Sequence, residues 1–392
     1  MDFSLTLEQR QLRKSVIAFA RSALPEGEES DRTSAFDRAG WQSCADFGVL
    51  GWPVAPEYGG SGLDPLSTII ALEALGYACR DNGLVFVANN HLWACAAYVN
   101  QYGTDEQRKR FLPPMCEGRL IGAHALTEHD AGSDILSLRT RAVPDGDSYV
   151  LNGTKTFISN APIADVFVVM ARTGADGRGQ DALSAFLVTR DMPGVTVTRE
   201  WEKSGLRGCP MGEITFTDCR VPVANLLGRP GDGYSIFTST IEWERAFMFA
   251  NQVGVMERIL DDCVHHADRR QQFGQSIGSF QAVAHKIADM KVRLELARLM
   301  LYKVGWLKTE GRLALAESVI TKLFVSESHV QAALDAVQIH GARGYLTDFG
   351  VERELRDAIG GTIYGGTSEI QRQIIAGLVG LPAADGRGSS VA

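Results

Sequence analysis

Apolar and polar positions follow three different patterns along the chain. From residue 1 to about 120 the apolar residues recur at helical spacing, as in the stripe that includes Leu5, Leu12 and Val16. Ser4, with Glu8 one turn later, is typical of a helix start, and residues 64–79 have the small and apolar side chains of a buried helix. We therefore predict an N-terminal helical domain over residues 1–120.

Short runs rich in β-forming residues replace this pattern between residues 121 and 230. They occupy residues 148–151, 167–170, 185–188 and 195–198, and turn-forming clusters such as 144–147 and 174–177 separate them. Several strands at this spacing predict a small barrel or sandwich, and we assign residues 121–230 to a middle β-barrel domain.

Helical spacing returns after residue 231. Three long segments, at residues 234–272, 281–311 and 313–340, have the pattern of amphipathic or almost wholly apolar helices. They predict a C-terminal four-helix bundle over residues 231–381, followed by a flexible Gly-, Ser- and Ala-rich tail at 382–392. Helices and strands do not alternate, which indicates an α+β fold class and argues against a parallel Rossmann sheet.

Composition narrows the classes of function. The 392 residues are 45% hydrophobic and 22% charged with a net charge of −8, which argues against a nucleic-acid-binding face and a polybasic membrane anchor. No apolar run approaches the ~20 residues of a membrane span, and charges interrupt the N-terminal stretch, unlike a signal peptide. The seven scattered cysteines predict free thiols in a reducing compartment. We expect a soluble, cytoplasmic protein.

Five motifs carry residues suited to a polar ring system or to phosphates. Small residues and hydroxyls allow close backbone approach, an aromatic residue followed two positions later by a hydroxyl can cover a flat ring, and an arginine fork suits a phosphate. Each motif alone is equally compatible with an ordinary loop, strand or helix end. The motifs lie at residues 125–134, 153–160, 269–281, 338–345 and 363–371.

Taken in order, these motifs resemble the acyl-CoA dehydrogenase flavoprotein family over residues 1–381. The resemblance implies the same three domains, one FAD per subunit and a homotetramer. It assigns flavin contacts to Leu126, Thr127, Gly132, Ser133, Phe157 and Ser159. It further implies that Arg270, Phe273 and Gln281, with Gln338 and Gly341 from a neighbouring subunit, hold the phosphate and adenosine end. Thr367 and Glu369 would contact FAD near its phosphates.

One departure from the family pattern concerns the catalytic base. Most members carry a glutamate where this chain has Gly365, so the carboxylate that removes the α-proton must come from elsewhere. Gly365 retains its backbone N–H, which can stabilise the thioester oxygen. Ala342 also replaces a common glycine, a smaller change.

Residues 239–248 offer two carboxylates, and helical geometry separates them. Glu244 shares a face with Ile241 and Phe247, and burial in an apolar stripe raises a carboxyl pKa toward the range of a useful base. Glu242 points about 160° away and has Arg245 one turn on, as a structural ion pair would. The alternative for Glu244 is a buried partner of an arginine. The isovaleryl- and long-chain enzymes of the family similarly carry their base in a Glu-Arg pair on this helix.

Local strings at residues 160–165, 209–213 and 243–246 resemble a smaller branch of the family. Its members act in antibiotic and toxin pathways and oxidise L-prolyl groups tethered to a peptidyl carrier protein by phosphopantetheine. This resemblance implies dehydrogenation of a prolyl thioester to a pyrroline or pyrrole. Trp243 and Phe247 can wall in a small ring, or they are simply core aromatics. We assign Ser133, Trp243, Arg245, Phe247 and Tyr364 to the substrate site, and Arg207 or Arg220 could meet an acidic carrier.

Two alternatives remain open. A short branched-chain, isovaleryl-type dehydrogenase would use the same base and flavin with free CoA, and a non-catalytic flavoprotein scaffold would have lost its base with the change to Gly365. A hydrolase is disfavoured because no G-x-S-x-G elbow is present, and the eight histidines form no metal-ligand pattern. The electron acceptor and the number of oxidations cannot be read from the sequence.

Overall fold

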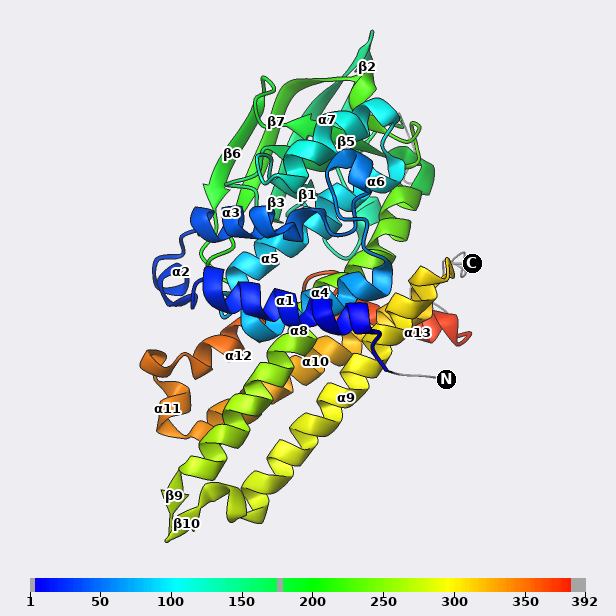
Figure 1. The fold of residues 1–392 in the computed structure, drawn as a ribbon. Coiled ribbons are helices and arrows are strands. Elements are labelled where there is room, and N and C mark those ends of the chain that lie inside the picture. Colours follow the sequence, from blue (N-terminus) through cyan, green and yellow to red (C-terminus); the bar gives the residue numbers. More distant parts are fainter. Residues whose placement is uncertain (1–3, 175–178, 382–392) are drawn as a thin grey trace.

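A computed structural model describes residues 4–174 and 179–381, arranged as a helical N-terminal region, a central β-sheet and a helical C-terminal region (Figure 1). The sheet lies at one end of the molecule and the long C-terminal helices extend to the other. The predicted tail at 382–392 lies outside the described residues, as does most of the predicted turn at 174–177.

The N-terminal region is helical, as predicted. Its first helix begins at Leu7, not after Ser4, because Thr6 forms a capping box with Gln9: the Thr6 hydroxyl accepts the Gln9 N–H while the Gln9 side chain accepts the Thr6 N–H. A π-helical turn (Leu92–Ala96) joins two of the helices. The helices are α1 (Leu7–Ala23), α2 (Glu28–Thr33), α3 (Arg38–Phe47), α4 (Pro65–Ala78), α5 (Asn82–His91), α6 (Ala97–Tyr102) and α7 (Asp105–Cys116).

The middle region forms one eight-stranded mixed sheet with separate apolar clusters on its two faces. The hydrogen-bonded order is β6-β7-β3-β2-β4-β5-β8, and β1 pairs in parallel with β4. The strands are β1 (Gly122–Ala125), β2 (Arg141–Asp145), β3 (Ser148–Ser159), β4 (Val166–Arg172), β5 (Leu183–Thr189), β6 (Val195–Glu200), β7 (Met211–Pro222) and β8 (Leu226–Leu227).

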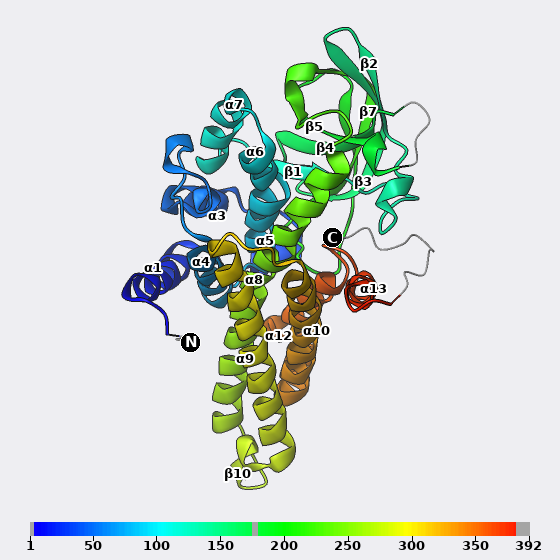
Figure 2. The same ribbon diagram turned by 90° about the vertical axis from the view of Figure 1, so that its right-hand side faces the viewer.

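Three long helices dominate the C-terminal region, and a short hairpin links the first two at their far end (Figure 1). The N-terminal half of α8 runs beside the sheet and the rest of that helix packs with α9 and α10 (Figure 2). The elements are α8 (Gly233–Arg269), β9 (Gln271–Gln272), β10 (Gln275–Ser276), α9 (Gln281–Thr309), α10 (Leu315–His340), α11 (Ala342–Tyr345), α12 (Val351–Ile359) and α13 (Ser368–Leu378).

Two glycines let α4 and α8 approach each other closely. A Cβ atom at Gly76 would lie 2.0 Å from the Asn251 carbonyl oxygen, and one at Gly254 would lie 1.9 Å from the Glu73 carbonyl oxygen. Neither position can carry a larger residue without separating the helices. The contact fixes α8, the helix that carries both candidate bases, against the N-terminal region.

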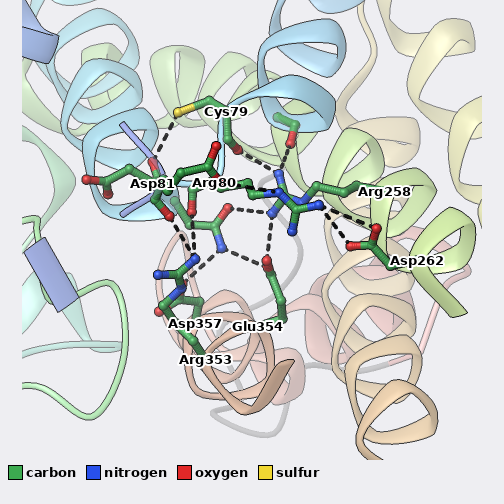
Figure 3. Close-up of polar contacts among 11 residues, drawn as sticks. Cys79, Arg80, Asp81, Arg258, Asp262, Arg353, Glu354 and Asp357 are labelled. Carbon is green, nitrogen blue, oxygen red and sulfur yellow. Dashed lines mark hydrogen bonds and ion pairs between the residues drawn. The ribbon is translucent and has the colours of Figure 1, made fainter. Parts of the chain in front are cut away.

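A buried polar network also joins these regions (Figure 3). Arg258 of α8 donates to the carbonyl oxygens of Gly76 and Cys79, at 2.7 and 2.6 Å, and to the Glu354 carboxylate of α12 at 2.8 Å. The Asn82 side chain donates to the second Glu354 oxygen at 2.9 Å. Burial alone would raise the pKa of Glu354, but Arg258 and Asn82 together lower it.

Asp357 extends the network to the middle region. Its carboxylate accepts one hydrogen bond from the Asn82 side chain and another from the Leu206 backbone N–H, which follows β6. Burial raises the pKa of Asp357 to about 6 despite the Leu206 N–H. One set of side chains therefore holds α5, α8, α12 and the segment after β6 together.

No helix among residues 4–174 and 179–381 combines the length and apolar composition that a membrane crossing needs. All seven cysteines lie in this described part, and each is buried and free.

Candidate active site

Glu244 lies on α8, with the buried side chains of Ile241 and Phe247 one turn before and after it. The Glu244 side chain is half-buried, and its carboxylate makes no hydrogen bond or ion pair with any residue that the structure describes. Burial raises its pKa to about 7, and the neighbouring Arg245 charge opposes that rise only in part. A carboxylate with this pKa and no partner suits a general base at neutral pH.

Glu242 has a structural role, but its predicted partner is wrong. It pairs with Lys308 near the end of α9 and accepts the Ala314 backbone N–H at 2.8 Å, not a bond from Arg245. The end of α9 and the following loop cover this side of α8 and bring Lys308 to it. Spacing along α8 alone could not reveal that long-range contact.

Arg245 turns instead toward the turn that carries Gly365. Its Nε donates to the Gly365 carbonyl oxygen at 3.5 Å, a long hydrogen bond, and the buried Gln371 side chain donates to the same oxygen at 3.1 Å and to the Gly366 oxygen at 2.9 Å. Gly365 and Gly366 have φ values of 65° and 86°, which favour glycine. The Gly365 N–H donates to no other residue in the described ranges, so it is available to a ligand.

Aromatic side chains surround this part of α8. Phe247 is fully buried between Trp93 and Trp243, with ring centroids 4.5 and 5.2 Å away, and Trp243 lies under the Lys308 ammonium. Tyr364 is half-buried and accepts a hydrogen bond from Gln252 at 2.7 Å. Phe247 supports the Glu244 turn from inside the core. Contacts of Trp243, Phe247, Arg245 and Tyr364 with an acyl group stay predictions.

The residues predicted to meet the flavin gather where β3 passes the loop after β1. A bulge in β3 between Lys155 and Ile158 places Phe157 at a φ of 58° and leaves it 48% exposed. The Thr127 carbonyl accepts the Thr156 N–H at 2.9 Å, which joins the loop to the bulge. Of the other residues predicted to contact the flavin, Leu126, Thr127 and Ser159 are half-buried, and Gly132 and Ser133 are exposed in the loop after β1.

An unpaired group beside this surface fits a polar cofactor. The Trp201 indole N–H is buried and has no hydrogen-bond partner among the described residues, and the Trp201 ring lies 5.3 Å from that of Phe157. A Cβ at Gly132 would meet no atom within 4 Å, so the loop leaves open space there. Buried polar groups rarely stay unpaired, and a ring system with polar edges could satisfy them.

The sequence interpretation missed a clamp beneath this loop. Lys155 is fully buried, and its ammonium donates to the Glu128 carboxylate at 2.8 Å and to the Leu126 carbonyl at 2.9 Å. Glu128 also accepts the Arg139 and Thr140 N–H groups. Burial lowers the pKa of Lys155 to about 8, and Glu128 limits the fall. Glu128 and Lys155 lie within the sequence motifs at 125–134 and 153–160. Membership of these motifs was the only indication of the pair that the sequence offered.

We expect Lys155→Met to loosen this loop and to raise the FAD dissociation constant at least about tenfold. The reason is that the variant leaves the Glu128 carboxylate buried without its cation. Titration of the apoprotein with FAD measures the effect. The double variant Lys155→Met/Glu128→Gln also removes the unpaired carboxylate, so it should recover part of the FAD affinity. Unchanged FAD affinity in Lys155→Met would contradict a role for the Lys155–Glu128 pair in flavin binding.

The second group of predicted FAD residues lies near the β9–β10 hairpin, at the end of the molecule away from the sheet (Figure 1). Arg270, Gln281, Gln338 and Gly341 are exposed there, and Phe273 is 93% exposed. Arg270 lines a cavity of about 860 Å³, whose walls carry basic side chains such as Arg269 and Arg343 and also acidic ones such as Glu26 and Glu354. The two groups therefore lie apart within one chain. Contact of both with one FAD, with residues contributed by a neighbouring subunit, stays a prediction.

Thr367 and Glu369 lie at the start of α13. The Thr367 hydroxyl caps this helix by accepting the Ile370 N–H at 3.3 Å, and Glu369 is exposed in the first turn. Their predicted contact with FAD stays untested. In the part of the chain that the structure describes, no group of three or more His, Cys, Asp or Glu side chains is placed to hold a metal ion.

The chain matches three family models in sequence. Residues 6–119 match the acyl-CoA dehydrogenase N-terminal domain, residues 123–219 the middle domain and residues 231–379 the C-terminal domain. The chain is 45% identical over 348 residues to an L-prolyl-[peptidyl-carrier protein] dehydrogenase of Pseudomonas fluorescens, which covers 88% of this chain and 91% of the relative.

Solved structures agree. The prolyl acyl carrier protein oxidase AnaB superposes with a TM-score of 0.94 and 46% identity over 96% of this chain and all of its own. PigA with FAD and proline superposes with a TM-score of 0.94 and 39% identity over 97% of this chain and all of its own. The predicted family and three-part fold are confirmed: the chain belongs to the acyl-CoA dehydrogenase family.

Proposed function

We propose that this chain is an FAD-dependent dehydrogenase that removes the α and β hydrogens of an L-prolyl thioester carried on a peptidyl carrier protein. The observation that carries the proposal is the unpaired, half-buried Glu244 carboxylate with a pKa near 7, one residue before the arginine that reaches Gly365. The prolyl substrate and the carrier come from the relatives, which are named for them. The comparisons support this function, as the sequence predicted.

Each protein group has a defined task. Glu244 accepts the α-proton, which is only weakly acidic beside a thioester carbonyl. The Gln371 side chain donates to the Gly365 and Gly366 carbonyl oxygens and so fixes this turn. The Gly365 N–H in the turn stabilises negative charge on the thioester oxygen. When bound, FAD supplies the acceptor for the hydride equivalent from the β carbon. Leu126, Thr127, Phe157 and Ser159 would hold the flavin against this site.

An experiment with the wild-type protein distinguishes this proposal from the main alternative, a branched-chain acyl-CoA dehydrogenase. Anaerobic mixing with L-prolyl carrier protein should bleach the flavin absorbance faster than mixing with isovaleryl-CoA. Faster bleaching by isovaleryl-CoA would favour a branched-chain acyl-CoA dehydrogenase, which shares the same base. Bleaching by neither would favour a non-catalytic scaffold, although an unpaired carboxylate of raised pKa serves no evident structural purpose.

The pKa of Glu244 predicts the pH dependence. The base acts only when ionised, so kcat/KM for the prolyl substrate should rise with pH through an apparent pKa near 7. Below that point it should fall about tenfold per pH unit. Initial rates with L-prolyl carrier protein between about pH 5.5 and pH 8.5 test this, and a flat profile would contradict it.

Further features belong to the proposal. We infer a homotetramer, because the adenosine-end residues lie far from the flavin surface of the same chain (Figure 1). We place the enzyme in the cytoplasm, in antibiotic or related natural-product biosynthesis. Arg207 and Arg220 stay candidates for meeting an acidic carrier: the Arg207 guanidinium donates to the Asp31 carbonyl, and Arg220 pairs with Asp145 at the surface, where both side chains are more than half exposed.

A further inference from the structure

Two buried polar side chains near Glu244 have no partner. Tyr98 is fully buried, and its hydroxyl makes no hydrogen bond to any residue of the described ranges. The Nε2 atom of His124 is likewise buried and unpaired. Leaving such groups unpaired costs stability, and native proteins do so rarely, so each requires an explanation.

These two side chains lie together, beside α8. The Tyr98 and His124 rings are 4.8 Å apart between centroids, and the His124 and Phe237 rings are 6.1 Å apart. His124 pairs with Val168 across β1 and β4, which places it on the sheet face that also packs against Tyr98, Phe237 and Ile241.

The same pair lies within the electrostatic reach of the base. Burial raises the pKa of Tyr98, and the Glu244 charge raises it further. Phe237 and Ile241 stand seven and three residues before Glu244, on the same side of the helix. Tyr98 and His124 therefore lie on the side of α8 that carries the base.

The backbone before Tyr98 is also unusual. The π-helical turn at Leu92–Ala96 interrupts the helical run between α5 and α6, just before Tyr98. Single π-helical turns of this kind occur frequently at functional sites.

We propose that the Tyr98 hydroxyl and His124 Nε2 recognise the ring nitrogen of the acyl group and so select proline over hydrocarbon acyl chains. This inference rests on the proposed function. A proline ring presents an N–H donor and, when neutral, a lone pair, whereas a branched-chain acyl group offers nothing to pair with these side chains. Burial, with Lys155 nearby, lowers the pKa of His124 to about 3, so its neutral imidazole has one donor and one acceptor nitrogen.

The test compares two thioesters on the same carrier protein: L-prolyl and cyclopentanecarbonyl, in which CH₂ replaces the ring N–H. In the wild type, kcat/KM should favour the prolyl substrate. Tyr98→Phe and His124→Leu should each lower this preference about 10–100-fold, chiefly by slowing prolyl oxidation, because one substrate hydrogen bond is lost. Tyr149→Phe is the matched control, since Tyr149 packs on Phe186 at the opposite face of the sheet.

FAD content and circular dichroism establish whether each variant is folded. The ratio of kcat/KM for the two thioesters does not depend on how much of each preparation is active. If both variants keep the wild-type preference for the prolyl over the cyclopentanecarbonyl thioester, the inference is overturned and the proposed function still stands. A wild type that oxidises isovaleryl-CoA and not L-prolyl carrier protein would overturn the proposed function itself.

Discussion

Glu244→Gln is expected to retain FAD and to lose about 10²–10⁴-fold in turnover of L-prolyl carrier protein, the range that a general base contributes. Gln preserves the size and polarity of the side chain, so the surrounding aromatic packing should not change. Burial raises the pKa of Glu244, so its ionisation above the unfolded-state pKa opposes folding. Near pH 8 the variant should therefore be at least as stable as the wild type.

Glu242→Gln is the matched control, two residues away on the same helix. Glu242 pairs with Lys308 and accepts the Ala314 N–H, so its loss should lower stability while turnover per bound FAD stays within a few-fold of the wild type. Steady-state rates normalised to flavin content compare the two variants. A large loss of turnover in Glu242→Gln together with none in Glu244→Gln would reverse our assignment of the base.

Arg258→Met should lower the free energy of unfolding by about 3–5 kcal/mol, the cost of removing one partner from a buried ion pair. The change leaves the Glu354 carboxylate buried without its cation and leaves the Gly76 and Cys79 carbonyls without a donor (Figure 3). These groups belong to α4, α12 and the segment between α4 and α5, so their contacts should loosen together. Denaturant titration followed by circular dichroism measures the effect.

Arg220→Met provides the comparison for Arg258→Met. Arg220 pairs with Asp145, but both side chains are more than half exposed, and such surface pairs contribute about 0–1 kcal/mol. Equal losses of stability in the two variants would show that the buried network does not hold the regions together.

Elements with a clear periodicity were predictable from sequence. The segments 281–311 and 313–340 became helices at Gln281–Thr309 and Leu315–His340, because long apolar stripes must be buried. The buried environment of Glu244 followed from its neighbours one turn away. These predictions depend on local spacing, which a single sequence records directly.

Features that depend on contacts across the chain were less accessible. Nothing near Glu242 indicates that Lys308 lies beside it, and nothing near Tyr98 places it against His124. The bulge that exposes Phe157 breaks simple strand alternation and depends on pairing with β7. Such contacts are fixed by tertiary packing, so they appear only once the elements are assembled.

The most direct test of the account isolates proton removal from flavin reduction. Enzyme whose FAD has been chemically reduced cannot accept hydride, but its base can still exchange the substrate α-proton with solvent. After incubation in D₂O, mass spectrometry of L-prolyl carrier protein should show one added deuterium with the wild type and none above background with Glu244→Gln. Equal exchange by both proteins would show that another group removes the α-proton.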